Sequence, residues 1–323
     1  MYSISRRRVL LGAAALATTP LTRSEDYPTR PIQLVHGFGA GGNADVIARL
    51  VAQKLQEMLK QPVVVDIKAG AGGMIATNYI AKAAPDGYSL VMLTGAHTVS
   101  AAMRKSLPYD PVKDFSFIST VSAFPFVIAV RAEHPAKSLP DLLALARQTP
   151  GKITFTSVGV GSTQHMVGEL LASSSGVQLL HIPYRGGGAP VQAVIGGDVD
   201  ILADTLTVAM PHIQSGRLRA LAVTSASAWP SIPSVPTVAA TVSGFEVRSW
   251  LGLAAPAGTP EVIVRKLNEE VRRVLQSTDI QKAFAGAGSE VAPCSPVEMR
   301  NMVQTDIARW RAVVARSRIP LQE

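Results

Sequence analysis

Short apolar stretches alternate with amphipathic segments through the first hundred residues. Stretches at 31–35, 62–66 and 88–93 predict strands, and the second of them lacks the polar alternation of a half-exposed strand. Segments 43–59 and 73–82 predict helices. The first has a one-sided apolar face at 3.6-residue spacing, formed by Ile47, Leu50, Val51, Leu55, Met58 and Leu59. This β-α-β-α-β order predicts a parallel, doubly wound α/β sheet.

The same alternation continues through the middle of the chain. Strands are expected at 126–130, 153–156, 180–182, 201–203 and 220–223, with helices at 139–148, 164–173, 189–195 and 208–215. A Pro- and Ser-rich segment at 229–236 indicates a crossing or linker. Two later helices have start signals, a hydroxyl cap at Thr259 before Pro260 and a capping box from Ser295 to Glu298. The length of 323 residues fits two lobes of ordinary size.

The N-terminus has the pattern of an export signal. Arg6, Arg7 and Arg8 precede an uncharged apolar run at 9–17, which ends in an A-x-A cleavage pattern. Nine residues are too few to span a bilayer, which needs about 20. Residues 1–24 are therefore expected to be a removable signal peptide, and the mature chain is expected in the periplasm. The paired arginines resemble a twin-arginine signal, so the export route stays open, and an ordinary buried first helix is the alternative.

Composition excludes several classes of protein. A chain with 47% hydrophobic and 17% charged residues can bury a sizeable core, which rules out global disorder. Cys294 is the single cysteine, so there is neither a disulfide framework nor a multi-cysteine zinc site. The net charge is +8, but residues 1–24 hold four arginines and no acid. Scattered bases and only 5% aromatic residues argue against nucleic acid as a partner.

A glycine-rich loop at 37–42 follows the first expected strand and precedes the first helix. Its main-chain N–H groups, together with the helix dipole, would make a site for a carboxylate or phosphate. The loop also fits G-x-G-x-x-G, and Asp66 ends the next strand at about the spacing of a dinucleotide fingerprint. A nicotinamide-dependent oxidoreductase is therefore an alternative. That alternative would require a set of catalytic residues further along the chain, and the sequence shows none.

Two further small-residue loops follow strands at 70–73 and 157–163. Because one lies in each half of the chain, the three loops together predict a cleft between lobes that binds an anion through amides and hydroxyls. Asp204 ends a buried-looking strand and is expected either to contact ligand or to cap the next segment. His165 lies in the first turn of a helix, near ligand or packed in the core. No metal-ligand spacing, G-x-S-x-G elbow or P-loop occurs, so no metal, cofactor or catalytic residue is expected.

Ten motifs in a fixed order resemble one known family, the Bug extracytoplasmic solute receptors of tripartite tricarboxylate transporters. In chain order they are 41–49 (GGNADVIAR), 70–73 (GAGG), 85–88 (PDGY), 107–111 (LPYDP), 161–165 (GSTQH), 183–186 (PYRG), 196–200 (GGDVD), 218–224 (LRALAVT), 235–237 (VPT) and 255–260 (APAGTP). The resemblance implies a two-lobed, type II-like periplasmic binding fold, with lobe 1 at 25–124 plus 227–323 and lobe 2 at 125–226.

The resemblance also implies a binding protein rather than an enzyme. A small carboxylate would be held between closing lobes for uptake or sensing, with a membrane transporter or a sensor as partner and a monomeric chain. The expected ligand-binding residues are Phe38, Gly39, Ala40, Gly41, Gly42, Ala71, Gly72, Thr94, Ala96, Ser157, Gly161, Ser162, Thr163, His165 and Asp204. Many family members have prolines in the first loop where this chain has Gly37, Gly39 and Ala40. Asp204, if it contacts ligand, favours an amino or hydroxy acid.

Overall fold

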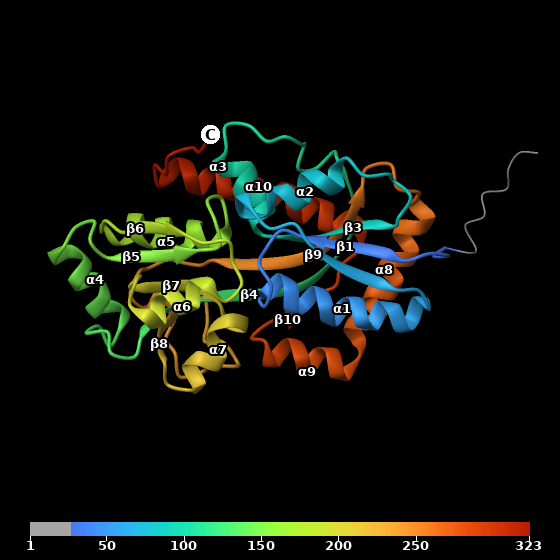
Figure 1. The fold of residues 1–323 in the computed structure, drawn as a ribbon. Coiled ribbons are helices and arrows are strands. Elements are labelled where there is room, and N and C mark those ends of the chain that lie inside the picture. Colours follow the sequence, from blue (N-terminus) through green and yellow to red (C-terminus); the bar gives the residue numbers. More distant parts are fainter. Residues whose placement is uncertain (1–26) are drawn as a thin grey trace, which may run out of the picture.

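The computed structural model describes residues 27–323, and the expected signal peptide lies outside this range (Figure 1). The strands are β1 (Ile32–His36), β2 (Val63–Ile67), β3 (Ser89–Thr94), β4 (Phe115–Arg131), β5 (Thr154–Ser157), β6 (Leu180–Pro183), β7 (Ile201–Thr205), β8 (Leu218–Val223), β9 (Arg248–Pro256) and β10 (Glu290–Val291). The helices are α1 (Asn43–Leu59), α2 (Met74–Ala81), α3 (Ala96–Met103), α4 (Leu139–Gln148), α5 (Thr163–Ser175), α6 (Ala189–Gly196), α7 (Leu206–Gln214), α8 (Glu261–Gln276), α9 (Thr278–Gly286) and α10 (Pro296–Arg316). Short 3₁₀ turns occur at η1 (Ala71–Gly73) and η2 (Val238–Ala240).

The strands form two groups that share β4. In the first strand group, β2, β1 and β3 are parallel neighbours, and β9 joins β3 and residues 115–125 of β4 in antiparallel fashion. In the second strand group, β6, β5 and β7 are parallel, and residues 126–131 of β4 pair antiparallel with β7 and β8. One long strand therefore runs through both groups, as the elongated molecule in Figure 1 shows.

A second segment of the chain crosses between the groups beside β4. The Thr224 hydroxyl accepts from the Phe126 N–H at 2.8 Å and donates to the Val247 carbonyl at 2.6 Å. Val247 N–H also donates to the Thr224 carbonyl at 2.9 Å. The side chain of Thr224 is fully buried. Its hydrogen bonds connect the end of β8, the middle of β4 and the segment that leads into β9.

The first strand group is a sheet covered on both faces. Alternate side chains point to opposite faces of a strand, so Leu34 and Leu90 meet one set of helices and Val35 and Val91 the other. The first face packs on α1 and α8, through Ile47, Val51, Leu55, Leu267 and Val271. The second face packs on α2 and α10, through Ala76, Ile80, Met299, Val303 and Ile307. Each such fully buried aliphatic side chain contributes roughly 1.5–3 kcal/mol to stability.

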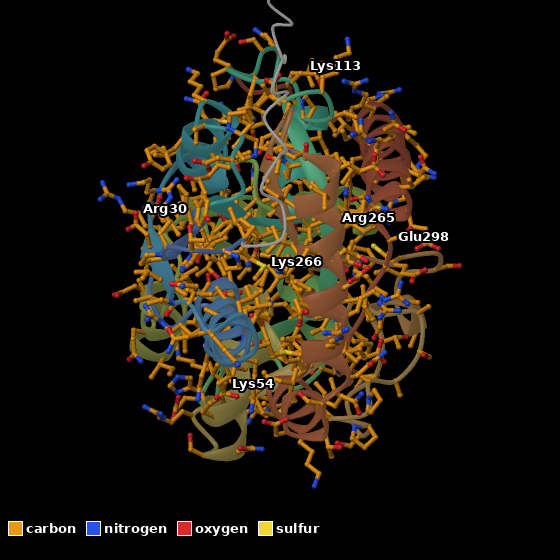
Figure 2. The ribbon with its side chains drawn as sticks, turned by 90° about the vertical axis from the view of Figure 1, so that its right-hand side faces the viewer. Arg30, Lys54, Lys113, Arg265, Lys266 and Glu298 are labelled. Atoms are coloured by element: carbon orange, nitrogen blue, oxygen red, sulfur yellow. The ribbon has the colours of Figure 1, made fainter. Side chains whose placement is uncertain are left out.

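Charged side chains tie the outer helices together. Figure 2 shows Lys54, Arg265 and Lys266 on the face that α8 crosses. Lys54 of α1 lies 2.8 Å from the Asp279 carboxylate of α9 and 3.2 Å from Glu57. Lys266 donates to the Tyr27 carbonyl at 2.5 Å, which attaches the start of the described chain to α8. Within residues 27–323, no helix combines the length and the apolarity needed to cross a membrane.

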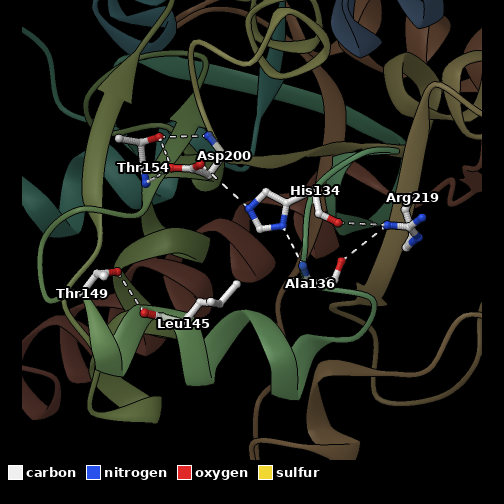
Figure 3. Close-up of polar contacts among 7 residues, drawn as sticks. All are labelled: His134, Ala136, Leu145, Thr149, Thr154, Asp200 and Arg219. Carbon is white, nitrogen blue, oxygen red and sulfur yellow. Dashed lines mark hydrogen bonds and ion pairs between the residues drawn. The ribbon is translucent and has the colours of Figure 1, made fainter.

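Polar contacts hold the end of the second strand group where β5 and β7 begin (Figure 3). The Asp200 carboxylate accepts from the Thr154 N–H and hydroxyl, both at 2.8 Å. Its other oxygen lies 3.9 Å from Nε2 of the buried His134, whose Nδ1 accepts from Ala136 N–H at 3.2 Å. These contacts hold the turn that leads into α4. The loops that form the candidate site lie at the opposite ends of the parallel strands, away from these contacts.

Several local expectations fail for reasons that local sequence does not reveal. The sheet contains antiparallel strands as well as the expected parallel ones. They are β9, which was not predicted from the sequence, and the first part of β4, which starts eleven residues before the expected 126–130 strand. Helices α3 and α9 were also missed. The Thr259 hydroxyl donates to the Pro256 carbonyl at 2.8 Å and does not cap α8, so that prediction is wrong. The capping box at Ser295 and Glu298 is confirmed, with both of its hydrogen bonds present.

Candidate functional site

The three glycine-rich loops meet where the two strand groups face each other. Gly39 N–H donates to the Arg185 carbonyl at 3.2 Å, joining the loop after β1 to the loop after β6. A side chain at Gly72 would place its Cβ 2.8 Å from the Val160 carbonyl oxygen, and Gly72 has a φ of +64°. Only glycine permits this approach of the loop after β2 to the loop after β5. The juxtaposition expected from the spacing of the loops is therefore present.

A fourth loop, at 186–188 before α6, belongs to the same meeting point. Gly39 and Gly186 form an isolated parallel bridge. A Cβ on Gly187, which has a φ of +68°, would lie 2.5 Å from the Ala40 carbonyl oxygen. Sequence reasoning quoted Gly186 within a family motif but placed no residue of this loop in the site. The run of three consecutive glycines was the available signal.

The Asp45 carboxylate determines the path of the first loop. It accepts from Gly41 N–H at 2.9 Å, from Arg49 Nε at 2.9 Å and contacts His36 Nε2 at 3.1 Å. Burial by itself would raise the pKa of Asp45, but these partners lower it below its usual value. Burial lowers the pKa of His36. Gly41 N–H is thus directed at Asp45, and this hydrogen bond holds the first loop against the start of α1.

A cavity of about 440 Å³, including its opening to solvent, lies between the loops. Five of the expected ligand-binding residues line it: Phe38, Gly42, Thr94, Thr163 and Asp204. A smaller cavity of about 260 Å³ shares Phe38 and Thr94 with the first and is lined by Gly72 and Ala96. The remaining expected residues line neither cavity. They are Gly39, Ala40, Gly41, Ala71, Ser157, Gly161, Ser162 and His165.

The loop after β5 rests on a pair of stacked imidazoles. The rings of His165 and His181 lie 4.0 Å apart between centroids. His181 Nε2 is 2.6 Å from the Ser157 hydroxyl, which accepts from Gly159 N–H at 3.0 Å. His165 Nδ1 accepts from Gly161 N–H at 3.4 Å. These residues therefore hold the loop from behind, and the Ser162 hydroxyl caps α5 by accepting from His165 N–H at 3.2 Å.

Three helices begin at the cavity wall. The caps or first residues of α1, α5 and α7 line it, represented by Gly42, Thr163 and Thr205. The first N–H groups of a helix lack intrahelical acceptors, and the helix dipole places about half a positive charge there. Helix starts from both strand groups thus point to one cavity. This arrangement suits a small anion.

Asp204 supplies the only ionisable side chain among the described residues that line this cavity. The carboxylate is 3% exposed, and its Oδ1 accepts from Gln164 Nε2 at 3.1 Å and from Thr205 N–H at 2.7 Å. Burial raises the pKa of Asp204 to about 6, although those hydrogen bonds lower it in part. Its environment therefore penalises negative charge, which makes it a candidate for contact with a hydrogen-bond donor.

Two lining residues that sequence reasoning missed as ligand contacts carry unused polar atoms. Asn43 Nδ2 and Thr205 Oγ1 are buried and have no hydrogen-bond partner among the residues described. Asn43 Oδ1 accepts from the Thr207 hydroxyl at 2.6 Å, which joins α1 to α7 across the cavity. Asn43 is the first residue of α1, and Gly42 occupies the cap position. The place of Asn43 in the site is visible only from its hydrogen bond to Thr207 on the other side of the cavity.

Comparison with known proteins identifies the family. Residues 47–319 match the tripartite tricarboxylate transporter family receptor. The chain belongs to this receptor family. A relative from Pseudomonas sp. strain P51, described as a UPF0065 protein in the tcbD-tcbE intergenic region, is 36% identical over 99% of this chain and 96% of its own length. BugT of Bordetella pertussis is 36% identical over 90% of each chain.

Solved structures of periplasmic binding proteins share the whole fold. BugD aligns with a TM-score of 0.88 at 32% identity, covering 92% of this chain and 100% of its own. An R. palustris protein solved with adipate aligns at 0.87 and 35% identity, covering 90% and 98%. MatC from Rhodopseudomonas palustris with bound malate aligns at 0.85 and 32%, covering 89% and 100%. The resemblance found in the sequence and the expected two-lobed fold are confirmed, and the oxidoreductase alternative is not supported.

Proposed function

We propose that this receptor binds a small carboxylate-containing metabolite between two closing lobes. The observation that carries the proposal is the convergence of three glycine-rich loops, at 37–42, 157–163 and 186–188, and three helix starts, from both strand groups, on one cavity. The fourth loop, at 70–73, lines the neighbouring cavity. The structural relatives solved with adipate and with malate support a carboxylate as ligand. No bond is made or broken in this function, so the chain acts as a binding protein and not as an enzyme.

The lobes in this proposal are residues 25–124 plus 227–323 and residues 125–226. Two segments would connect them, the middle of β4 and the crossing near Thr224. The hydrogen bonds of Thr224 to Phe126 and Val247 place both connections side by side, as a hinge requires. Rotation about this pair of segments would open the cavity without breaking either sheet.

Contacts across the cavity describe the shut form. Besides the bond between Thr207 and Asn43, the Ser100 hydroxyl donates to the Gly161 carbonyl at 3.1 Å and Gly39 N–H to the Arg185 carbonyl. A ligand favours this form only by its greater affinity for it. Helix starts of both lobes would offset the desolvation of the carboxylate, and the shut lobes would exclude water from it.

The residues proposed to contact ligand are those that line the cavity. Among the expected set these are Phe38, Gly42, Thr94, Thr163 and Asp204. Gly39, Ala40, Gly41, Ala71, Ser157, Gly161, Ser162 and His165 would shape and hold the loops, and Gly72 and Ala96 would act from the neighbouring cavity. This division assigns ligand contact and loop support to different residues, and mutagenesis can separate the two roles.

Export and partners follow from the family. Residues 1–24 would be removed on export to the periplasm, where the mature chain would act as a monomer. The ligand-bound form would be read by the membrane subunits of a transporter or by a sensor. A pull-down of membrane components that depends on added ligand would support this part of the proposal.

The decisive experiment is identification of the bound molecule. Mass spectrometry of small molecules that co-purify with the mature chain, followed by a thermal-shift screen of mono-, di- and tricarboxylic acids, should reveal a carboxylate that binds. Its methyl ester should not bind, because the ester lacks the anionic charge that the helix starts stabilise. Binding of reduced nicotinamide cofactor together with failure of every acid would contradict the proposal.

A further inference from the structure

The cavity wall lacks the charge that a ligand with several carboxylates would need. Within residues 27–323, no Lys, Arg or His side chain lines it, and the one ionisable lining group is the acid Asp204. The larger apolar side chains of the wall are Phe38, Phe124, Phe126, Val158, Val208 and Leu251, and its other polar side chains are uncharged amides and hydroxyls. Walls of this kind fit the carbon body of a ligand and give a second carboxylate no countercharge.

Asp204 occupies the place where a second ligand carboxylate would otherwise bind. Its Oδ1 takes the Thr205 N–H at the start of α7 and the Gln164 amide at the start of α5. The positive end of α7 is therefore already matched by a carboxylate of the protein, which the Gln164 side chain holds from the first turn of α5. A carboxylate of the ligand beside Asp204 would face a like charge in a site of low dielectric.

The polar groups left unused near Asp204 are suited to a ligand that donates hydrogen bonds. Both hydrogen bonds to Asp204 go to Oδ1, and Oδ2 accepts none among the residues described. The adjoining Thr205 hydroxyl lies close enough to lower the pKa of Asp204, but its Oγ1 forms no hydrogen bond of good geometry within residues 27–323. A carboxylate oxygen only accepts, whereas a threonine hydroxyl can donate and accept. A hydroxyl or ammonium group on the ligand would donate to Asp204 Oδ2. Asn43 Nδ2 is an unpartnered donor that an acceptor on the ligand would satisfy.

We propose that the receptor selects small acids with a single carboxylate, an apolar carbon body and a hydroxyl or ammonium group that donates to Asp204. This inference rests on the proposed function and narrows it. The single carboxylate lies at the helix starts away from Asp204, and the body packs on the phenylalanine side chains. Ligands with two or three carboxylates are disfavoured because Asp204 repels the second.

The test compares acids of matched length by calorimetry on the mature chain at pH 7.5. The probes are butyrate, 4-hydroxybutyrate, 4-aminobutyrate and succinate, with benzoate and 4-hydroxybenzoate as a second matched pair. Each donor-bearing acid should bind at least about tenfold more tightly than its partner without the donor, and than succinate. The basis is that a buried acceptor left without a donor loses its hydrogen bonds to water and gains none in return.

Asp204→Asn supplies a reciprocal readout that mere structural damage would not give. Asparagine keeps the Oδ1 acceptor but loses the charge, so binding of 4-aminobutyrate should weaken while binding of succinate strengthens. Asp198→Asn is the matched control, because Asp198 is an exposed acid outside the cavity, and it should leave both affinities unchanged. If the Asp204 variant does not fold, the comparison of probes on the unaltered chain decides.

Four outcomes overturn the inference. Succinate binding as tightly as the donor-bearing acids would show that a second carboxylate is accepted. Equal affinity for butyrate and 4-hydroxybutyrate would show that Asp204 does not recognise a hydrogen-bond donor on the ligand. Failure of all six probes, with tight binding of a tricarboxylate or longer dicarboxylate, would refute the inference and leave the proposed function intact. Failure of every carboxylic acid would refute both.

Discussion

At the scale of single residues, the site depends on positions where a side chain is forbidden. Gly187 has a φ of +68°, and a Cβ added to this residue would lie 2.5 Å from the Ala40 carbonyl oxygen. Its neighbour Gly188 has a φ of −80°, and an added Cβ there would meet nothing within 4 Å. Two adjacent glycines thus differ in whether the opposite loop requires them.

Gly187→Ala should therefore impair closure, whereas Gly188→Ala should not. Alanine at 187 must push the loop after β1 away, because the clash is with main chain and cannot be relieved by a rotamer change. We expect calorimetry with the tightest-binding acid of the screen to show at least about a tenfold loss of affinity for the 187 variant, equivalent to about 1.4 kcal/mol. Equal affinities for the two variants would contradict the observed loop contact.

Asp204 makes a second prediction at this scale, for stability against pH. Its pKa is about 6 in the folded chain and about 4 when unfolded, so the folded state holds a proton that the unfolded state releases. The stability linked to this proton is present below about pH 4 and is lost as the pH rises through 6. Asp204→Asn should raise the free energy of unfolding at pH 7.5 by up to about 3 kcal/mol.

Urea unfolding of both chains at pH 7.5 and at pH 4.5 checks this. The difference between variant and original should shrink toward the lower pH, because at pH 4.5 the Asp204 carboxyl is protonated in the folded state and is no longer fully ionised in the unfolded state. Asp198→Asn should show no such trend, since Asp198 is exposed. A difference that is the same at both pH values would mean that Asp204 is not desolvated in the folded chain.

At the scale of elements, the loop after β5 and the start of α5 depend on a pair of stacked imidazoles. Burial, and then the neighbouring His165, lower the pKa of His181 to about 4, and the coulombic effect of Glu169 opposes this shift. The groups facing His181 are Ser157 and Phe155 of β5 and His165 and Glu169 of α5. A proton on His181 would place a charge inside this buried stack, beside the ring that contacts Gly161 N–H.

Acidification should therefore loosen this loop selectively. Because the folded pKa of His181 lies below the unfolded value of 6.5, stability is present above pH 6.5 and is lost as the pH falls toward 4. Hydrogen exchange, corrected for its intrinsic pH dependence, should rise between pH 7 and pH 5 more at 157–163 than in the turn at 85–88, which contacts no histidine among the described residues. His181→Phe should abolish the pH-dependent part, and His134→Gln should retain it. A uniform rise in both segments would count against the role of the imidazole pair.

At the scale of the whole molecule, the shut form is held by few polar contacts across the cavity. The Thr207 hydroxyl lies 2.6 Å from Asn43 Oδ1 and 2.8 Å from the Ala287 carbonyl, so one side chain of the second strand group contacts two elements that flank the first. The position of Thr207 therefore connects the ligand cavity with the position of one lobe relative to the other. Loss of such a contact shifts the balance between open and shut forms without altering either lobe.

Thr207→Val should open the chain that has no ligand. Valine keeps the volume but loses the hydroxyl, so solution scattering should show a larger radius of gyration and calorimetry a severalfold weaker affinity, with a small change in unfolding free energy. Thr241→Val, at an exposed position, is the matched control. Unchanged scattering together with unchanged affinity would show that this contact does not hold the lobes shut.

Local signals were enough to predict much of this molecule. The apolar spacing of α1, the capping box of Ser295 and Glu298, and the turns formed by glycine-rich loops all act within a few residues of the chain. Those signals, with the order of ten motifs, led to the α/β class, the family and the meeting of the loops. They depend on periodicity, hydrogen bonds to nearby main chain and backbone freedom, which each segment carries by itself.

Contacts between distant segments were decided only by the tertiary structure. The length of β4 and the existence of β9 depend on each other as pairing partners more than a hundred residues apart. Gly187, Asn43 and Thr205 enter the site because other loops or helices lie opposite them, and Gly41 N–H is directed at Asp45 by the fold of its own helix start. Pairing, burial and unmet hydrogen bonds are properties of two surfaces in contact, so no segment records them alone.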